Sequence, residues 1–386
     1  MHIYFDNSAT TKPWPEVAER AAWAITERYG NPSSSHLPGK QSRAELARSR
    51  QYVADLLGCQ KNEIYFTSGG TESNNLAIFG GSSAMRKYGG KIVTTAVEHA
   101  SVTKALRILR LQDWQVVYIP SPKGVLDLEE FEKAVDKDTV FVSVMLVNNE
   151  IGCIFPVEEV SRIIKRKGSP ALLHCDAVQA FGKIPFTPEG IGADLVSVSA
   201  HKIHGIKGAG ALFARSGLKM HALQFGGGQE RGLRPGTEGL PQLAAFGEAA
   251  KLTRERMASD APKMAALRDY CHKALLEKIP EAEIFSTDKG APHIVSFSLP
   301  GEDSDVVVRY LNSKNIFVSN GAACRSHYKN KNPQILESFG LRSEAIYSVI
   351  RVSFDANNTF EEIDVFVQTL AGRKKETKRT SIIQQE

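Results

Sequence analysis

Residues 64–75 read IYFTSGGTESNN, in which a short apolar run is followed by a pair of glycines and then by polar residues typical of a helix start. This order predicts a strand, a tight turn and a helix N-terminus. The first backbone N–H groups of a helix have no helical partner and the helix dipole favours negative charge, so the turn can bind a phosphate. A plain turn with a helix cap is the alternative. The stretch matches neither GxGxxG nor the P-loop pattern, which disfavours a dinucleotide or a nucleoside triphosphate.

Short apolar stretches of this kind alternate with helical patterns from about residue 16 to residue 250. The predicted strands are 64–67, 91–95, 116–119, 140–147, 171–175, 195–199 and 210–214, and helices are predicted at 42–57 and 156–167. Several of these strands are apolar on both alternating faces, as strands are when helices cover both sides of a mainly parallel sheet. The sequence therefore predicts an α/β large domain with a mainly parallel sheet flanked by helices.

After residue 240 the pattern changes to that of a smaller α+β domain. A long charged helix is predicted to about residue 279, followed by strands at 293–299, 316–319 and 348–354 and helices at 303–312 and 359–370. We predict four parts. They are an N-terminal segment (1–15) that packs with the small domain, a large domain (16–250), a small C-terminal domain (251–370) with a mobile loop at 319–333, and a basic flexible tail (371–386).

The composition is that of a folded globular protein. Of the 386 residues, 42% are hydrophobic and 24% are charged. The longest apolar run has eight residues (140–147) and already contains Ser143. This is far fewer than the ~20 residues that span a bilayer, and the N-terminus has no secretory pattern. We therefore expect a cytoplasmic protein that does not bind membranes. The five cysteines include no CxxC pair, which indicates reduced thiols of which at most one does chemistry.

The formal net charge of +5 is concentrated at one end of the chain. Five Lys or Arg residues and two Glu residues lie at 372–386, which leaves a charge near +2 for all other residues. A solvated, frayed terminus is the usual explanation of such a tail, so we expect no direct nucleic-acid binding.

Two other predicted strands end in residues suited to ligand binding. Asp176 follows the strand at 171–175 and places a carboxylate where open α/β sheets bind ligands, with a helix N-cap as the alternative. Lys202 follows the strand at 195–199, between His201 and His204. A lysine crowded by cations and shielded from water has a lowered pKa and serves as a nucleophile or base. Zinc is the rival interpretation of the two histidines, but no HExxH pattern or further ligand cluster accompanies them, so no metal is expected.

A phosphate cradle, a carboxylate and a lysine at three strand ends are the groups that pyridoxal 5'-phosphate requires. With them, the sequence resembles the cysteine desulfurases of the NifS/IscS type, which belong to the class V aminotransferase family of fold-type I enzymes. The matching stretches cover nearly the whole chain: YFDNSATT at 4–11, GNPSS at 30–34, FTSGGTESNNL at 66–76, EH at 98–99, VNNEIG at 147–152, DAVQ at 176–179, SAHK at 199–202, GGGQERG at 226–232, Arg234 with Gly236 and Thr237, and SNGAAC at 319–324.

The resemblance implies a role for the residue at each matching position. Lys202 would form the Schiff base with the cofactor and move the Cα proton, His99 would stack on the cofactor ring and move the thiol proton, and Cys324 would receive the sulfur as a persulfide. The other implied cofactor contacts are Gly70, Thr71, Asp176, Gln179, Ser199, His201 and, across a homodimer, Thr237. Asn149 and Arg351 would hold the substrate carboxylate.

The implied function is a cysteine desulfurase that converts L-cysteine to L-alanine and delivers sulfur to an acceptor, such as an iron–sulfur scaffold protein or a tRNA thiolation route. Arg325 and His327 would favour the thiolate of Cys324, although they make its loop bulkier and more basic than is usual in the family. The alternatives are a selenocysteine lyase or another class V enzyme, in which Cys324 is incidental, and a non-catalytic sulfur-relay or scaffold protein. A cysteine on a mobile loop argues against the first, and the set of Lys202, Asp176 and His99 argues against the second.

Overall fold

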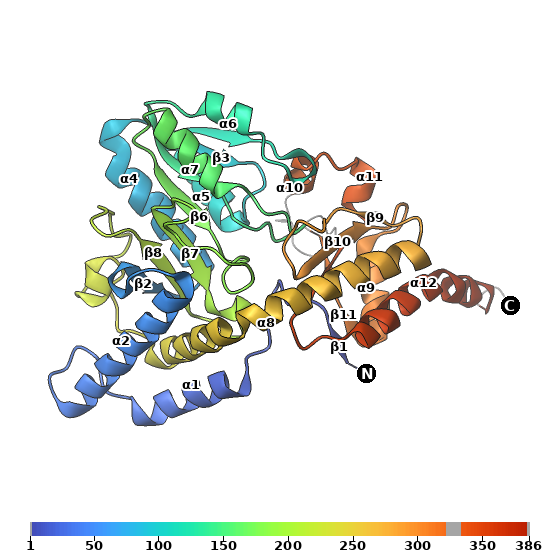
Figure 1. Cartoon of the computed structure of the whole chain (residues 1–386), viewed down its shortest axis with the longest axis horizontal. Coiled ribbons are helices and arrows are strands. Elements are labelled where there is room, and N and C mark those ends of the chain that lie inside the picture. The colour runs from blue at the N-terminus through green and yellow to red at the C-terminus, as the bar shows by residue number, and fades with distance from the viewer. Residues whose placement is uncertain (1, 322–332, 384–386) are drawn as a thin grey trace. The chain divides into compact units, whose positions relative to one another are not determined.

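The structure of the chain is a computed structural model that describes residues 2–321 and 333–383 (Figure 1). The chain divides into two compact units. The large unit comprises Thr10–Asn148 and Ile154–Ala258, and the small unit comprises Met1–Ala9, Asn149–Cys153 and Ser259–Glu386. The helix α8 (Leu240–Lys278) runs without interruption through residue 250, where the sequence predicts the small domain to begin.

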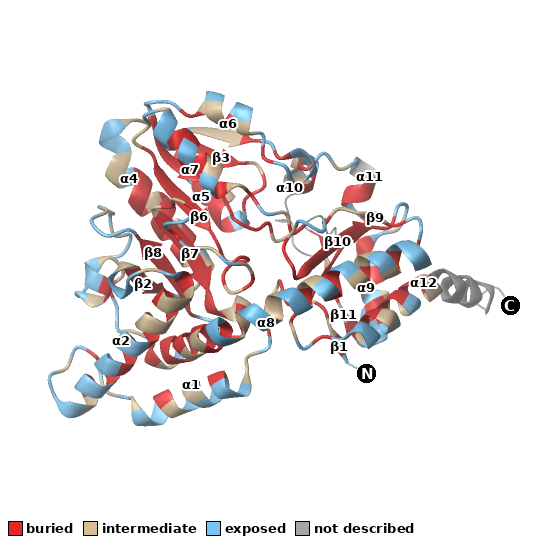
Figure 2. Cartoon of the chain, in the orientation of Figure 1, coloured by how far each residue is buried: buried red, intermediate tan, exposed pale blue. Residues whose placement is uncertain are grey.

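The large unit is built on a seven-stranded sheet. Its strand order is β2 (Ile64–Thr67), β8 (Gly210–Ala214), β7 (Leu195–Ser199), β6 (Leu172–Asp176), β5 (Thr139–Ser143), β3 (Lys91–Thr95) and β4 (Gln115–Ile119). All pairs are parallel except those of β8, which is antiparallel to both of its neighbours. Every residue of β3, β5, β6, β7 and β8 is buried, as Figure 2 shows in red. The predicted α/β fold with a mainly parallel sheet is confirmed.

Helices connect and cover these strands, and two of them, α2 (Leu37–Leu57) and α7 (Val157–Arg166), were predicted from apolar periodicity. In α7, the residues Val157, Val160, Ile163 and Ile164 are buried at helical spacing. The other helices of the large unit are α1 (Pro15–Glu27), α3 (Gly70–Asn75), the π turn η2 (Leu76–Gly81), α4 (Ser82–Met85), α5 (Ala100–Arg110) and α6 (Leu128–Ala134), with short turns η1 (Lys61–Glu63), η3 (Arg86–Tyr88), η4 (Pro122–Gly124), η5 (Ala200–Lys202) and η6 (Gln229–Gly232).

Two elements differ in length from their prediction. The helix expected at 42–57 begins five residues earlier, because His36 accepts a hydrogen bond from the Gly39 N–H and Pro38 is tolerated in a first helical turn. The strand expected at 140–147 ends at Ser143. The following residues stay buried and continue along β6, where the N–H groups of Val144 and Leu146 donate to backbone oxygens.

The small unit contains two short sheets. β1 (Ile3–Tyr4) pairs with β11 (Ile316–Phe317), and a four-stranded antiparallel sheet has the order β12 (Ser319–Asn320), β13 (Val349–Ser353), β10 (Ile294–Ser298) and β9 (Glu283–Ile284). Its core joins the N-terminal segment to the C-terminal helix, since the ring of Phe5 meets those of Phe354 and Phe366 edge-on at 5.1 and 5.8 Å. The other helices of this unit are α9 (Ser304–Ser313), α10 (Pro333–Ser338), α11 (Ser343–Ile346) and α12 (Phe360–Ile383).

The segment predicted as the C-terminal tail begins at residue 371. Its backbone continues α12 as far as Ile383. The sequence after Gly372 contains no further glycine or proline and is rich in Lys, Arg and Glu, which are good helix formers. Over the described residues, no helix combines the length and the apolar character needed to cross a membrane.

A buried ion pair fixes the loop at 226–237 to the large unit. Glu230 accepts hydrogen bonds from both Nη atoms of Arg50, at 2.6 and 2.7 Å, and from the backbone N–H of Phe66 at 2.9 Å. The Glu230 side chain is 2% exposed and that of Arg50 is 13% exposed. A bidentate, charge-assisted pair of this kind holds the loop in one register against β2.

Removal of the Glu230 carboxylate should therefore destabilise the large unit. We expect Glu230→Ala to lower the free energy of unfolding by about 3–5 kcal/mol, because it leaves the Arg50 charge buried without a partner. Glu158→Ala, which breaks an exposed pair on α7, should cost less than about 1 kcal/mol. Urea denaturation of both variants measures the two changes, and equal changes would show that the buried pair does not stabilise the loop.

Candidate functional site

Three strands of the large unit present their carboxyl ends at the same edge of the sheet. β6 and β7 are parallel, and β2 runs in the same direction as β7 because both are antiparallel to β8. The residues that follow these strands are Ser68 to Gly70, Ala177 to Gln179 and the turn η5, which contains Lys202. Ligands of open α/β sheets bind outside such carboxyl ends.

The turn after β2 packs closely against β8 and against the segment that follows β6. A Cβ atom on Gly210 would lie 2.5 Å from the Gly69 Cα, and one on Gly70 would lie 2.7 Å from a methyl group of Val178. Ser199, at the end of β7, has a buried hydroxyl with no hydrogen-bond partner among the described residues. A Cβ built on Gly69 would be 3.9 Å from this hydroxyl. The turn and Ser199 therefore form a cradle with an open polar atom, which fits a phosphate oxygen.

Asp176 is buried at the end of β6 and faces two donors. Its Oδ1 accepts the Val178 N–H at 3.0 Å, and its Oδ2 accepts the side-chain amide of Asn74 at 2.7 Å. Gln179 is buried one turn further along the same segment. Both of these groups can only donate, so Asp176 acts as a hydrogen-bond acceptor. A group that binds a protonated pyridine nitrogen must be an acceptor as well. Asn74 was not predicted as a site residue, although it lies in the polar stretch that begins α3.

Lys202 is half-buried at the end of η5, next to His201. Burial, together with the positive charges of Lys202 and Lys207, lowers the pKa of His201 to about 4. His201 is therefore neutral near pH 7, and an imidazole N–H remains a possible donor to an anion.

His204 has a structural role instead. It stacks on the Trp14 ring at 4.3 Å between centroids, and its Nδ1 donates to the Lys12 carbonyl at 2.9 Å. Within residues 2–321 and 333–383, no group of three His, Cys, Asp or Glu side chains is arranged to hold a metal ion.

His99 is exposed and forms the N-cap of α5. Its Nδ1 accepts the Ser101 N–H at 3.1 Å and lies 2.8 Å from the Ser101 hydroxyl. The preceding residue, Glu98, is fully buried. Its Oε1 accepts from the Thr95 hydroxyl and from the Met145 N–H, and its Oε2 has no partner among the described residues. Burial, with a contribution from the Asp176 charge, raises the pKa of Glu98 to about 8.

The two predicted substrate residues lie in the small unit and contact each other. Arg351 donates from Nη1 to the Asn149 carbonyl at 2.8 Å and from Nη2 to Asp6 at 3.1 Å. Its Nε is buried without a hydrogen-bond partner among the described residues. Because a carboxylate can bind a guanidinium through Nε and Nη2, this edge of Arg351 fits a substrate carboxylate. Asp6 lies in the quoted stretch at 4–11, but its contact with Arg351 was not predicted.

Of the remaining predicted residues, two lie at the surface and one lies outside the described residues. Thr71 and Thr237 are exposed. The loop that carries Thr237 is tied to α3 by an ion pair between Arg234 Nε and Glu72 at 2.8 Å. Cys324 and its neighbours at 322–332 lie outside the described residues.

Comparison with known proteins places the chain in a family. The family model for "Aminotransferase class-V" matches residues 3–366. The chain belongs to the aminotransferase class-V family. It is 42% identical over 373 residues to the "NifS/IcsS protein homolog" of Lactobacillus delbrueckii subsp. bulgaricus, with 95% of both chains covered. It is 36% identical over 372 residues to "Cysteine desulfurase IscS" of Clostridium botulinum, with 95% of this chain and 93% of that protein covered.

A solved "NifS-like protein" shares the fold of this class-V chain. Its TM-score is 0.91 and its identity is 36%, with 97% of this chain and 100% of that chain covered. The predicted resemblance to the NifS/IscS type is thereby confirmed.

Four cysteines of this class-V chain lie among the described residues, namely Cys59, Cys153, Cys175 and Cys271. Cys175 and Cys271 are buried, and burial holds the pKa of both thiols above the usual range. Burial likewise raises the pKa of Cys59 to about 12. Because the thiolate is the reactive form, these three cysteines are poor nucleophiles. Cys153 is partly exposed.

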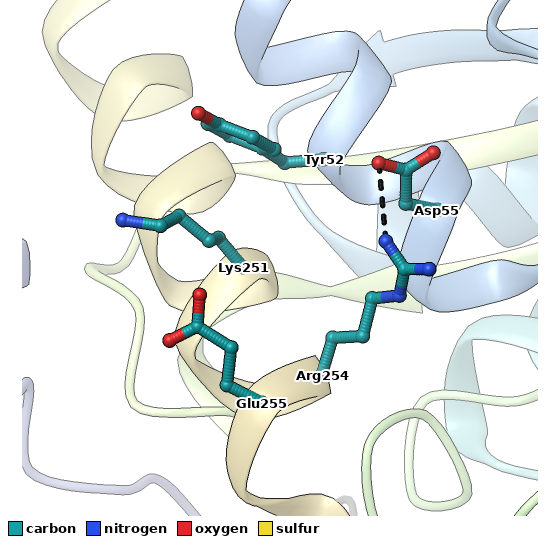
Figure 3. Close-up of a pocket in the computed structure, with 5 residues that line it drawn as sticks. All are labelled: Tyr52, Asp55, Lys251, Arg254 and Glu255. Carbon is teal, nitrogen blue, oxygen red and sulfur yellow. Dashed lines mark ion pairs between the residues drawn. The ribbon is translucent and has the colours of Figure 1, made fainter.

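The structure also contains a charged pocket that the sequence did not predict (Figure 3). Tyr52, Asp55, Lys251, Arg254 and Glu255 line it, and its volume is about 350 Å³. An ion pair of 3.4 Å joins Arg254 to Asp55, and Lys251 is paired with Glu248 at 3.1 Å. None of the predicted site residues of this class-V chain lines this pocket.

The buried Glu98 should make the stability of the protein depend on pH. Its pKa of about 8 in the folded chain, against an ordinary value of 4.5, means that the folded state holds a proton that the unfolded state has lost. The contribution of Glu98 to the free energy of unfolding is therefore largest below pH 4.5 and decreases as the pH rises towards 8. Glu98→Gln removes this dependence, so its stability relative to the wild type should increase steadily over that range.

Urea denaturation at several pH values between 4.5 and 8.5 measures the effect, with the exposed Glu129→Gln as the control. Burial lowers the pKa of His174 to about 4. The free energy of unfolding that depends on this histidine decreases as the pH falls below 6.5, which is the opposite pH dependence to that of Glu98. A constant difference between Glu98→Gln and the wild type would contradict the raised pKa of Glu98.

Proposed function

We propose that the protein is a pyridoxal 5'-phosphate-dependent cysteine desulfurase, which converts L-cysteine to L-alanine and transfers the sulfur to Cys324. Relatives named cysteine desulfurase support this function over nearly the whole chain. The observation that carries the proposal is the common edge of β2, β6 and β7. There the glycine turn follows β2, the buried Asp176 carboxylate ends β6, and the unpartnered buried hydroxyl of Ser199 and then Lys202 lie at the end of β7.

The residues at this edge fit the cofactor. Pyridoxal phosphate, when bound, supplies an electron sink for the charge that develops on the substrate Cα. We assign phosphate contacts to Gly70, Thr71, Ser199 and His201, and Thr237 would reach the phosphate in a partner subunit. Asp176 would accept from the pyridine nitrogen, Gln179 would bind the phenolic oxygen, and His99 would stack on the ring. Lys202 would hold the cofactor covalently and then move the Cα proton.

The substrate would be held by its carboxylate on Arg351, with Asn149 beside it. The thiolate of Cys324 would attack the substrate sulfur. A sulfur–sulfur bond forms as the carbon–sulfur bond breaks, and protonation of the carbon yields alanine and a persulfide on Cys324. The thiolate must be free for this step. We therefore also propose a reducing compartment, the cytoplasm, and a protein acceptor such as an iron–sulfur scaffold.

Lys202 should be the only lysine that carries the cofactor covalently. The purified protein should be yellow, and borohydride followed by peptide mapping should fix the cofactor on the Lys202 peptide. Lys202→Ala should lose covalent attachment, whereas Lys207→Ala, a control on the same loop, should retain it. Attachment to any other lysine would remove Lys202 from its role.

The protein should be a homodimer with a shared site. Thr237 is exposed, and the nearby Phe225 and Leu223 are 91% and 43% exposed, which is unusual for large apolar side chains at the surface. Phe225→Asp should therefore shift the protein to a monomer in light scattering and weaken cofactor binding. Leu111→Asp, at an equally apolar exposed position, should do neither. A fully active monomer would exclude the shared site.

Cys324 distinguishes the desulfurase from the two alternatives. Cys324→Ser should retain bound cofactor but lose sulfide and alanine formation from cysteine by a factor of about 100 or more, because a hydroxyl cannot carry the persulfide. A selenocysteine lyase would keep its activity on selenocysteine in this variant, and a non-catalytic scaffold would have no activity even in the wild type. Wild-type turnover of cysteine by Cys324→Ser would overturn the proposed mechanism.

A further inference from the structure

A chain of hydrogen bonds connects Asp176 to His99 through two residues that have no assigned role. The side-chain amide of Asn74 donates to Asp176 Oδ2 at 2.7 Å and to the Ser101 hydroxyl at 2.8 Å. The Ser101 hydroxyl in turn lies 2.8 Å from His99 Nδ1. Asn74 is 1% exposed and Ser101 is 9% exposed, so water competes little with these bonds.

The direction of each bond in this chain follows from the donors. The backbone N–H of Ser101 can only donate, and it points at His99 Nδ1 from 3.1 Å. Nδ1 is therefore the nitrogen without a proton, and neutral His99 carries its proton on Nε2. Since the Ser101 oxygen accepts from Asn74, its own hydrogen is available for Nδ1. In this arrangement both Ser101 hydrogens share the single lone pair of Nδ1, and Asn74 Oδ1 is buried without a hydrogen-bond partner among the described residues.

We propose that Asn74 and Ser101 are positioning residues that couple Asp176 to His99 and hold His99 as the Nε2–H tautomer. This inference deepens the proposed function. An Nε2–H group on an exposed ring is a hydrogen-bond donor, so His99 is suited to bind the thiolate form of the substrate sulfur rather than to remove a proton from the thiol. Asn74 at the same time gives Asp176 a fixed donor, which orients the carboxylate.

The tautomer can be measured directly by ¹⁵N NMR on protein labelled at histidine. The His99 signal is identified by its loss in His99→Gln, and we expect an unprotonated Nδ1 and a protonated Nε2. Because the measurement needs no turnover, it stands even if the protein fails to release sulfur from cysteine. A wild-type His99 protonated on Nδ1 would overturn the proposal.

The coupling is tested by a double-mutant cycle. Asn74→Leu removes the donor, keeps the approximate shape of the side chain and adds no charge beside Asp176, and it should shift the His99 ¹⁵N signals although Asn74 does not contact His99. The same substitution in a Ser101→Ala background should no longer shift them, because the link is missing. Asn75→Leu is the matched control, since among the described residues the Asn75 amide bonds to the backbone oxygens of Thr71 and Ser101 and to no side chain. An equal shift with and without the Ser101 hydroxyl would contradict the coupling.

A second measurement applies if Asn74→Leu does not fold. In the cofactor-loaded enzyme, Ser101→Ala should lower kcat about fivefold with KM for cysteine nearly unchanged, which corresponds to the loss of one hydrogen bond. Ser101→Thr, which keeps a hydroxyl, should restore kcat. A Ser101→Ala enzyme with wild-type kcat, or a Thr variant as impaired as the Ala variant, would show that the hydroxyl has no positioning role.

Discussion

The parallel hydrogen-bond ladder between β6 and β7 is the constraint on which the site depends. It pairs Asp176 on β6 with Ser197 on β7. Ser199 comes two residues after Ser197 and the turn that contains Lys202 follows, so the carboxylate and the lysine lie at the same edge of the sheet. β2 and β7 are both antiparallel to β8, so they run in the same direction. The glycine turn after β2 therefore lies at the same edge. A shift of one residue in this register would move each of these side chains to the opposite face of the sheet.

Polar side chains inside the sheet support this arrangement. His174, two residues before Asp176, bridges the hydroxyl of Ser143 on β5 and that of Ser197 on β7, at 2.9 and 3.0 Å. Because burial lowers its pKa to about 4, the ring is neutral and can use one nitrogen as donor and the other as acceptor. The buried Glu98, with its raised pKa, is likewise protonated near neutral pH. Two titratable side chains near Asp176, those of Glu98 and His174, are therefore uncharged near neutral pH.

The sequence was sufficient for the strands of the large unit and for the residues at their ends. Short apolar runs that stop at Gly69, Asp176 or Ser199 carry a local signal, because both the buried strand and the polar residue after it are visible in the chain. The contacts of Asn74, Ser101 and Asp6 were not predictable in this way. Asn74 and Asp176 are 102 positions apart, and Asp6 and Arg351 are 345 positions apart. Only the folded chain shows that these side chains meet.

We have proposed that sulfur from cysteine passes to Cys324 in a protein whose cofactor is held at one edge of the sheet. The sharpest test is mass spectrometry of the peptides after a single turnover with ³⁴S-labelled cysteine. One labelled sulfur atom is expected on the Cys324 peptide and none on the peptides of Cys59, Cys153, Cys175 and Cys271. Label on Cys153 or Cys175 in place of Cys324, or alanine formed with no labelled peptide, would contradict the proposal.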